Sequence, residues 1–108
     1  MKVLTEGHRY ELPNFEKKEE AGQVIQFIEK VPTSTLNGVV FNGGELTTVN
    51  DGTTNEDLLE VLIDRMQYLQ NKFPCRENAL VITKLEESLM WKRTSDRVKR
   101  NVEGKQLK

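Results

Sequence analysis

The spacing of hydrophobic residues changes about halfway along the chain. In the first half, short apolar segments are separated by turn-forming Asn, Gly and Pro residues, a pattern typical of strands and hairpin turns. Residues 23–29 are rich in β-branched and aromatic side chains, and residues 9–12, 39–41 and 45–49 are shorter segments of the same kind. We therefore expect a small antiparallel β-sheet within residues 1–52.

The second half has the three- and four-residue spacing of amphipathic helices. Residues 53–57 combine hydroxyls and carboxylates in the arrangement of a capping box. Two apolar stripes follow, one formed by Leu58, Leu59, Leu62, Ile63, Met66 and Leu69 and the other by Ala79, Ile82, Leu85 and Leu89. Pro74 separates the stripes, because proline lacks an N–H and suits the first turn of a new helix. The short break predicts an antiparallel helical hairpin over residues 53–103, whose second helix ends near Arg100.

Strands followed by helices predict an α+β fold. The 108 residues suffice for one domain, with a β-rich part at 1–52, the hairpin at 53–103 and a tail at 104–108. Only 36% of the residues are hydrophobic, and chains near this length bury about 60–70% of their unfolded surface. Apolar residues also lie off the main helical stripes, namely Leu80, Val81, Met90 and Trp91. Either the sheet or another subunit must cover them, and we favour a homo-oligomer.

The composition argues against several classes of protein. The formal net charge is −1, whereas proteins that coat nucleic acids are strongly basic. Apolar runs are far shorter than the roughly 20 residues of a membrane span, and the first residues become polar too early for a secretory signal. One cysteine and one histidine supply neither an intrachain disulfide nor, in a single chain, the usual ligands of a zinc site. We therefore expect a cytosolic protein without a metal or cofactor.

Enzyme signatures are missing as well. His8 has no nucleophile in a motif with it, and Cys75 is most simply a small hydrophobic residue at the helical elbow, although a helix N-terminus could activate it. The glycines at 43–44 and 52 lack the Gly-Lys-Ser/Thr sequence of a phosphate loop. The acidic residues of the first helix have no histidine partner for a di-metal site. We therefore expect binding without turnover and no catalytic residue.

Tyr68 and Asn78 flank Phe73 at equal sequence distances, so they would be level in an antiparallel hairpin. An aromatic ring on which a base stacks, together with an amide that reads the base edge, can recognise adenine. Ordinary packing of Tyr68 and a polar first-turn role for Asn78 are the alternatives.

Basic residues concentrate at the C-terminal end, where positions 92–108 hold seven of the 16 Lys and Arg residues but two of the 17 acidic ones. Arg93 and Arg97 are one helical turn apart, so their guanidiniums share a face and can clamp a pyrophosphate. A solvated tail and self-association are the alternatives. Asn78 and Arg93 are 15 residues apart, which is about 22 Å along a helix. One nucleotide that contacts both therefore needs the basic end of a second subunit, unless there are two separate sites.

Six stretches of the sequence resemble the phage Thoeris anti-defence family, whose members sequester immune signals and share a helical-hairpin domain with phage anti-CBASS proteins. They lie at residues 8–15, 23–30, 51–57, 61–66, 72–78 and 83–103, and so extend over nearly the whole chain. The most specific combination is KFPCREN at 72–78 followed by LEE and MW within 83–103.

The resemblance implies a non-catalytic protein that binds glycocyclic ADP-ribose, the NAD-derived messenger of TIR-domain proteins, in the cytoplasm of the infected bacterium. It also implies dimers that assemble into hexamers and, in some members, a second site for CBASS cyclic tri- or dinucleotides. The residues carried over to the messenger pocket are Tyr68, Asn78, Arg93, Arg97 and Arg9, and Arg76 is carried over to the second site. The segment from Trp91 to Arg93 is shorter here than in the family, which shifts the helical phase of both C-terminal arginines.

Two other functions stay open on the sequence alone. One is a small homo-oligomeric phage protein that binds host protein or DNA through its basic C-terminal helix. The other is a hydrolase of cyclic nucleotides. Affinity that falls steeply with salt would indicate DNA binding, whereas a chemically altered ligand would indicate a hydrolase.

Overall fold

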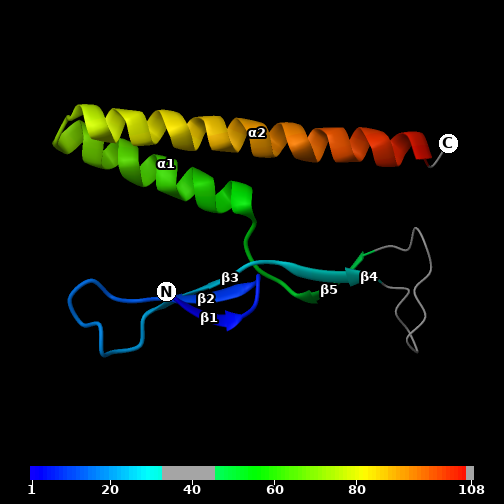
Figure 1. Ribbon diagram of the computed structural model, residues 1–108, viewed down its shortest axis with the longest axis horizontal. Helices are drawn as coiled ribbons and strands as arrows, with labels where there is room; N and C mark the ends of the chain where they lie inside the picture. The colour runs from blue at the N-terminus through cyan, green and yellow to red at the C-terminus, as the bar shows by residue number, and fades with distance from the viewer. Residues whose placement is uncertain (33–45, 107–108) are drawn as a thin grey trace. The chain divides into compact units, whose positions relative to one another are not determined.

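The computed structural model describes residues 1–32 and 46–106, with side chains up to Arg97. The chain divides into two compact units, Met1–Thr54 and Asn55–Lys108, which Figure 1 shows as strands and helices respectively. Strands therefore precede helices along the chain, and the predicted α+β fold is confirmed. The boundary between the units lies close to the predicted change at 52/53, and the grouping of both into one domain stays a prediction.

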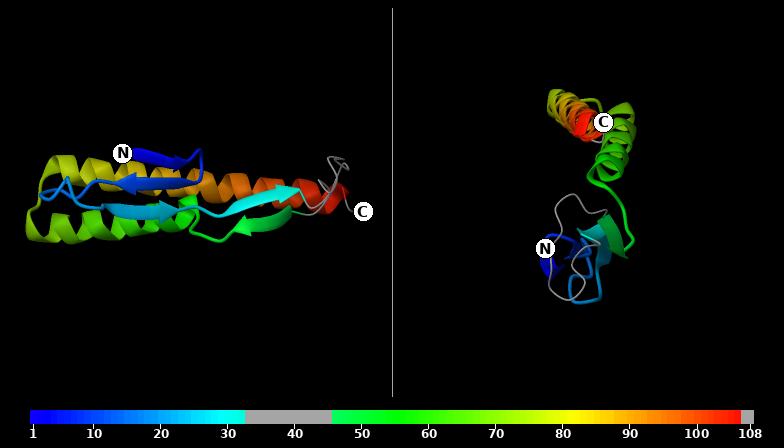
Figure 2. Two further views of the ribbon diagram at one scale, coloured as in Figure 1. Left: turned by 90° about the horizontal axis from the view of Figure 1, so that it is seen from below. Right: turned by 90° about the vertical axis from the view of Figure 1, so that its right-hand side faces the viewer.

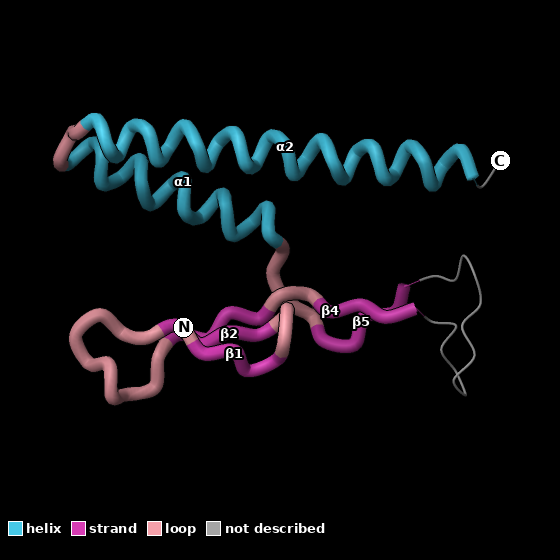
Figure 3. The backbone as a smooth tube through the Cα atoms, viewed as in Figure 1, coloured by secondary structure: helices cyan, strands magenta, loops and turns pink. Residues whose placement is uncertain are grey.

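The first unit contains a three-stranded antiparallel sheet in the order β1-β2-β3 (Figure 3). Its strands are β1 (Lys2–Thr5), β2 (Arg9–Leu12) and β3 (Gln23–Gln26). The turn between β1 and β2 uses Gly7 at φ +76°, a conformation that glycine adopts without the penalty of a side chain. Strand β2 matches the prediction for residues 9–12, whereas β1 was not expected, because its short sequence carries no alternating pattern.

A second, two-stranded antiparallel sheet pairs β4 (Glu29–Pro32) with β5 (Leu46–Asn50). Strand β5 corresponds to the segment predicted at 45–49. The expected strand at 39–41 lies outside the described residues. The expected strand at 23–29 is shorter in the structure: residues 23–26 form β3, and Glu29 already begins β4, which belongs to the other sheet.

The interruption between β3 and β4 is caused by a contact with a distant residue. The backbone of Thr53 inserts beside it: Thr53 N–H donates to Gln26 O at 2.8 Å, and Ile28 N–H donates to Thr53 O at 2.9 Å. A side chain at Gly52 would collide with the backbone oxygen of Gln26, so glycine permits this close approach. The chain thus changes hydrogen-bond partner between β3 and β4, which no local sequence pattern could reveal.

The second unit is an antiparallel hairpin of α1 (Asn55–Lys72) and α2 (Arg76–Gln106), which lie side by side in Figures 1 and 2. At 1.5 Å per residue the helices are about 27 Å and about 46 Å long. The C-terminal part of α2 therefore continues beyond the first turn of α1. The predicted hairpin is confirmed, but α2 runs past Arg100 and through Gly104, because one glycine costs a helix only about 1 kcal/mol and need not end it.

The elbow of the hairpin is capped by Cys75. Its carbonyl accepts the Ala79 N–H at 3.2 Å and its Sγ accepts the Asn78 N–H at 3.4 Å, as an N-cap side chain does. Pro74 therefore lies just before the cap and not within the first helical turn. Cys75 lies at the elbow as expected, and its thiol is exposed in the single chain and faces the first N–H groups of α2.

Hydrophobic burial in the single chain is slight. Leu89, at 8% exposure, is the buried hydrophobic side chain among the residues whose side chains are described. The four apolar residues expected to need a cover, Leu80, Val81, Met90 and Trp91, are all exposed, Trp91 by 65%. In the described part of the chain, no helix has the length and apolar character needed to cross a bilayer. Many of the apolar side chains that the structure describes are therefore in contact with water in the single chain.

Candidate ligand-binding site

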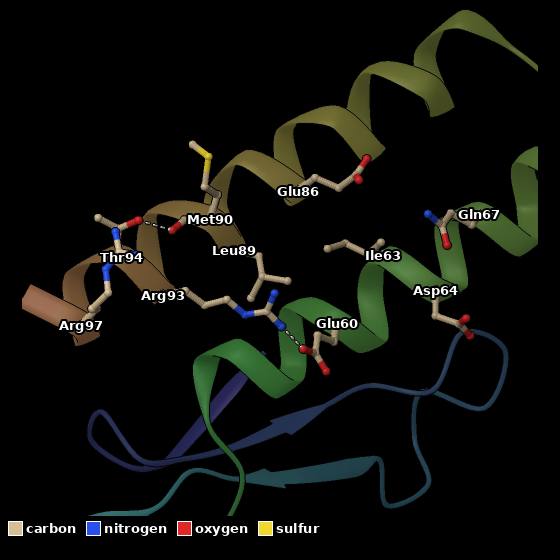
Figure 4. Close-up of a pocket in the computed structure, with 10 residues that line it drawn as sticks. All are labelled: Glu60, Ile63, Asp64, Gln67, Glu86, Leu89, Met90, Arg93, Thr94 and Arg97. Atoms are coloured by element: carbon tan, nitrogen blue, oxygen red, sulfur yellow. Dashed lines mark hydrogen bonds and ion pairs between the residues drawn. The ribbon is translucent and has the colours of Figure 1, made fainter.

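The two helices of the hairpin enclose a groove of about 900 Å³, shown in Figure 4. Four α1 residues and six α2 residues line it: Glu60, Ile63, Asp64, Gln67, Glu86, Leu89, Met90, Arg93, Thr94 and Arg97. They recur at spacings of three and four, because such residues share one face of a helix. The volume lies within the range of small-molecule sites, about 300–1,000 Å³.

The groove has a mixed chemical lining. Ile63 and Leu89 provide apolar surface between the helices, while carboxylates and guanidiniums surround it (Figure 4). Guanidiniums donate forked hydrogen bonds to phosphates, and carboxylates accept them from hydroxyl or amino groups. Such a lining suits a polar ligand that carries both an anionic group and hydrogen-bond donors.

The structure places Arg93 and Arg97 on the same groove, as their spacing indicated. The guanidinium of Arg93 forms an ion pair with Glu60, which reaches it from α1. Arg93 and Glu60 are 59% and 50% exposed, and pairs of this kind contribute about 0.2–1 kcal/mol. Arg97 makes no ion pair with any residue whose side chain is described. Both arginines can therefore turn donors toward an anion in the groove.

Lys92, next to Arg93 in sequence, contacts different residues. Its Nζ lies 3.8 Å from Glu56 of α1 and 3.6 Å from Asp96 of α2. This lysine therefore links the two helices and does not line the groove.

Tyr68 and Asn78 do not line the groove. Tyr68 of α1 is 51% exposed, and Lys72 Nζ lies 4.9 Å from its ring centroid. Asn78 lies in the first turn of α2, where its backbone N–H donates to the Cys75 thiol. Since α2 is one continuous helix, Asn78 and Arg93 are about 22 Å apart along it. A single chain therefore does not bring the predicted adenine-binding residues to the predicted pyrophosphate clamp.

The other two predicted arginines lie at element ends. Arg76 is the exposed first residue of α2, where the positive end of the helix dipole adds to its charge. Arg9 is the exposed first residue of β2 and pairs with Gln26 of β3, so it belongs to the first unit. The ligand roles of all six residues stay predictions.

Sequence reasoning did not identify the acidic side of the groove. Glu60 and Asp64 were considered only as metal ligands, and Glu86 was not singled out. In the described part of the chain, no cluster of three or more His, Cys, Asp or Glu side chains could hold a metal ion. The available signal was the spacing of Glu60, Asp64 and Gln67, which forms a polar stripe on α1 beside its apolar one.

Comparison with known proteins identifies the hairpin. The family model described as "Acb2/Tad1, hairpin domain" matches residues 35–92, more than half of the chain. The chain therefore belongs to the Acb2/Tad1 hairpin-domain family, and the resemblance found in the sequence is confirmed. The matched segment contains Tyr68, Arg76 and Asn78 and ends one residue before Arg93.

A particular relative extends this result. The protein named "Thoeris anti-defense 1" of Bacillus phage SBSphiJ7 is 52% identical to this chain over 75 residues. The alignment covers 56% of this chain and 53% of that protein. The chain thus spans about half the length of the curated relative it matches.

Proposed function

We propose that this chain is a phage anti-defence protein that counters Thoeris immunity by binding glycocyclic ADP-ribose and holding it without cleaving it. The observation that carries the proposal is the groove of a family hairpin in which Arg93 and Arg97 face one 900 Å³ space. The name of the phage relative supports the anti-Thoeris role. The protein acts in the infected bacterial cell, where the messenger is made.

The chemistry of this ligand matches the candidate residues. Cyclised ADP-ribose has an adenine, two riboses and a pyrophosphate. The two guanidiniums bind the pyrophosphate through charge-assisted hydrogen bonds, which are stronger than neutral ones. Tyr68 stacks on the adenine and Asn78 pairs with its edge. Nanomolar affinity corresponds to about 12 kcal/mol, so most of the ligand must be enclosed.

The same proposal requires more than one chain at each site. Asn78 and Arg93 are too far apart on α2 to contact one compact ligand, so the partner chain supplies the basic end. The exposed apolar residues support self-association, since Leu80, Val81 and Leu85 also line an apolar groove of about 300 Å³ on α2. We propose a homodimer that assembles further into a hexamer.

A second site is proposed around Arg76, for cyclic tri- or dinucleotides of CBASS. Arg76 is the first residue of α2, two residues before Asn78. Arg76→Ala should weaken cyclic trinucleotide binding and leave capture of the ADP-ribose messenger unchanged, because the resemblance gives Arg76 to the second site only. If Arg76→Ala weakened the binding of both ligands equally, the two ligands would share one site.

The function is tested by capture and release. The purified protein is incubated with the products of a TIR-domain protein, washed, heat-denatured and analysed by mass spectrometry. We expect chemically intact glycocyclic ADP-ribose to be released. An altered product would indicate a hydrolase, and no retained nucleotide would refute the proposal. Salt-sensitive binding of DNA that ignores the messenger would favour the alternative of a nucleic-acid partner for the basic helix.

Variants locate the site in the same assay. Arg93→Ala should weaken binding by about 2 kcal/mol or more, roughly 30-fold, because a charged hydrogen-bond donor is lost. The variant should therefore lose the messenger during the wash and show no capture in this assay. Arg65→Ala is the matched control, since Arg65 is an arginine of the same hairpin that does not line the groove. Equal effects of the two substitutions would show only a dependence on overall charge.

A further inference from the structure

The arginine expected to hold the ligand's phosphate already has an anionic partner in the free protein. Figure 4 shows the Glu60 carboxylate of α1 against the Arg93 guanidinium of α2, inside the groove. A carboxylate and a phosphate present similar oxygen acceptors to a guanidinium. Glu60 therefore occupies, on Arg93, the place that a phosphoryl oxygen of the ligand would take.

We propose that Glu60 is an internal counter-ion that competes with anionic ligands for Arg93, so that capture requires the carboxylate to leave before a phosphoryl oxygen can bind. This inference rests on the proposed function and adds a positioning residue that regulates the same site. The class of ligand is a nucleotide with a negatively charged phosphoryl group, because a neutral ligand gains nothing from displacing Glu60.

The charge of the groove supports competition. Three carboxylates, Glu60, Asp64 and Glu86, share the space with two guanidiniums. These carboxylates repel an anion that enters the groove. The anion can contact an arginine only after the carboxylate paired with that arginine has moved away. Glu60 is the carboxylate in contact with Arg93, and both side chains are half-exposed, so the pair can open at small cost.

Competition by Glu60 should change the association rate of the ligand and not its dissociation rate. If only the open pair binds ligand, the apparent association rate is reduced by the fraction of molecules in which the pair is open, and the dissociation rate is unaffected. Glu60→Gln keeps the shape of the side chain but removes its charge. We therefore expect this variant to bind glycocyclic ADP-ribose about two- to fivefold faster, with an unchanged dissociation rate.

Asp64 provides a control for charge alone. It lines the same groove one helical turn after Glu60, and it forms no ion pair with Arg93. Asp64→Asn removes the same formal charge from the groove. A faster association of this variant would therefore measure the effect of one less negative charge near the ligand, without release of Arg93. The competition model expects a smaller gain from Asp64→Asn than from Glu60→Gln.

The experiment is stopped-flow binding of glycocyclic ADP-ribose, with adenosine as the uncharged probe, to the wild type and to both variants. Glu60→Gln is also tested in the Arg93→Ala background, where it should have no effect. If the ligand dissociated faster from Glu60→Gln than from the wild type, Glu60 would serve to hold Arg93 in place for the ligand. If both carboxylate variants increased the association rate equally, the effect would be one of net charge alone. Either result overturns the inference.

Failure of the proposed function gives a different result. A wild type that retains no adenine nucleotide would refute capture itself and the inference with it. A wild type that captures the messenger while Glu60→Gln binds at the wild-type rate would refute the inference alone. Circular dichroism of each variant confirms that the helices are intact.

Discussion

The most informative prediction concerns the origin of the two halves of one site. Asn78 and Arg93 are 15 residues apart on the unbroken helix α2, which separates them by about 22 Å along its axis. A site that uses both must therefore combine Asn78 of one chain with Arg93 of another. Asn78→Ala and Arg93→Ala should each abolish capture on their own.

Mixing the two inactive variants should restore capture. When equal amounts are unfolded and refolded together, half of the dimers contain one chain of each kind. In a two-fold symmetric dimer, each of these mixed pairs has one site with both residues and one site with neither. The expected capacity is therefore about one quarter of the wild-type capacity, measured as the amount of glycocyclic ADP-ribose retained per chain after washing.

A matched mixture tests the assignment. Tyr68 and Asn78 are proposed to act from the same end of one hairpin, so a mixture of Tyr68→Ala and Asn78→Ala has no site with both residues and should stay inactive. No recovery in the Asn78→Ala and Arg93→Ala mixture would refute the shared site. Equal recovery in both mixtures would show that Tyr68 and Asn78 act from different chains.

Three further predictions concern stability and assembly. Leu89→Ala should lower the free energy of unfolding in urea by about 2–3 kcal/mol, since Leu89 is buried between the helices; a loss below about 1 kcal/mol would show that the seam is not packed. Trp91→Ala should leave the helical circular dichroism unchanged but weaken self-association in sedimentation velocity, because this side chain is exposed in the single chain; an unaltered sedimentation coefficient would place Trp91 outside the interface. Cys75→Ser should raise the melting temperature through about 0.5–1 kcal/mol of added stability, since a hydroxyl caps the Asn78 N–H better than a thiol does; a lower melting temperature would contradict the cap.

The helical unit could be predicted because its signals are local. The apolar spacing of α1 and α2 and the break at Pro74 depend on neighbours within one or two turns, and both were confirmed. The end of α2 was misplaced because a single glycine does not determine where a helix stops. The cap at the elbow was not predicted, because the sequence does not show that the Cys75 thiol turns toward the N–H of Asn78.

The candidate site was predictable only in part. The shared face of Arg93 and Arg97 follows from the pitch of one helix, and the structure places both on one groove. Their acidic partner could not be found in this way. Glu60 precedes Arg93 by 33 residues, and their contact depends on how the two helices of the hairpin are aligned.

The order of strands and helices, the hairpin and the distance between Asn78 and Arg93 follow from the amino-acid sequence by itself, because periodicity, proline stereochemistry and helical rise act within a short segment. Tertiary structure alone decided that residues 23–32 divide between two sheets, since Thr53 supplies hydrogen bonds from a remote part of the chain. It also decided that Glu60 meets Arg93. Contacts between distant segments depend on the folded arrangement of the whole unit, and no local pattern encodes them.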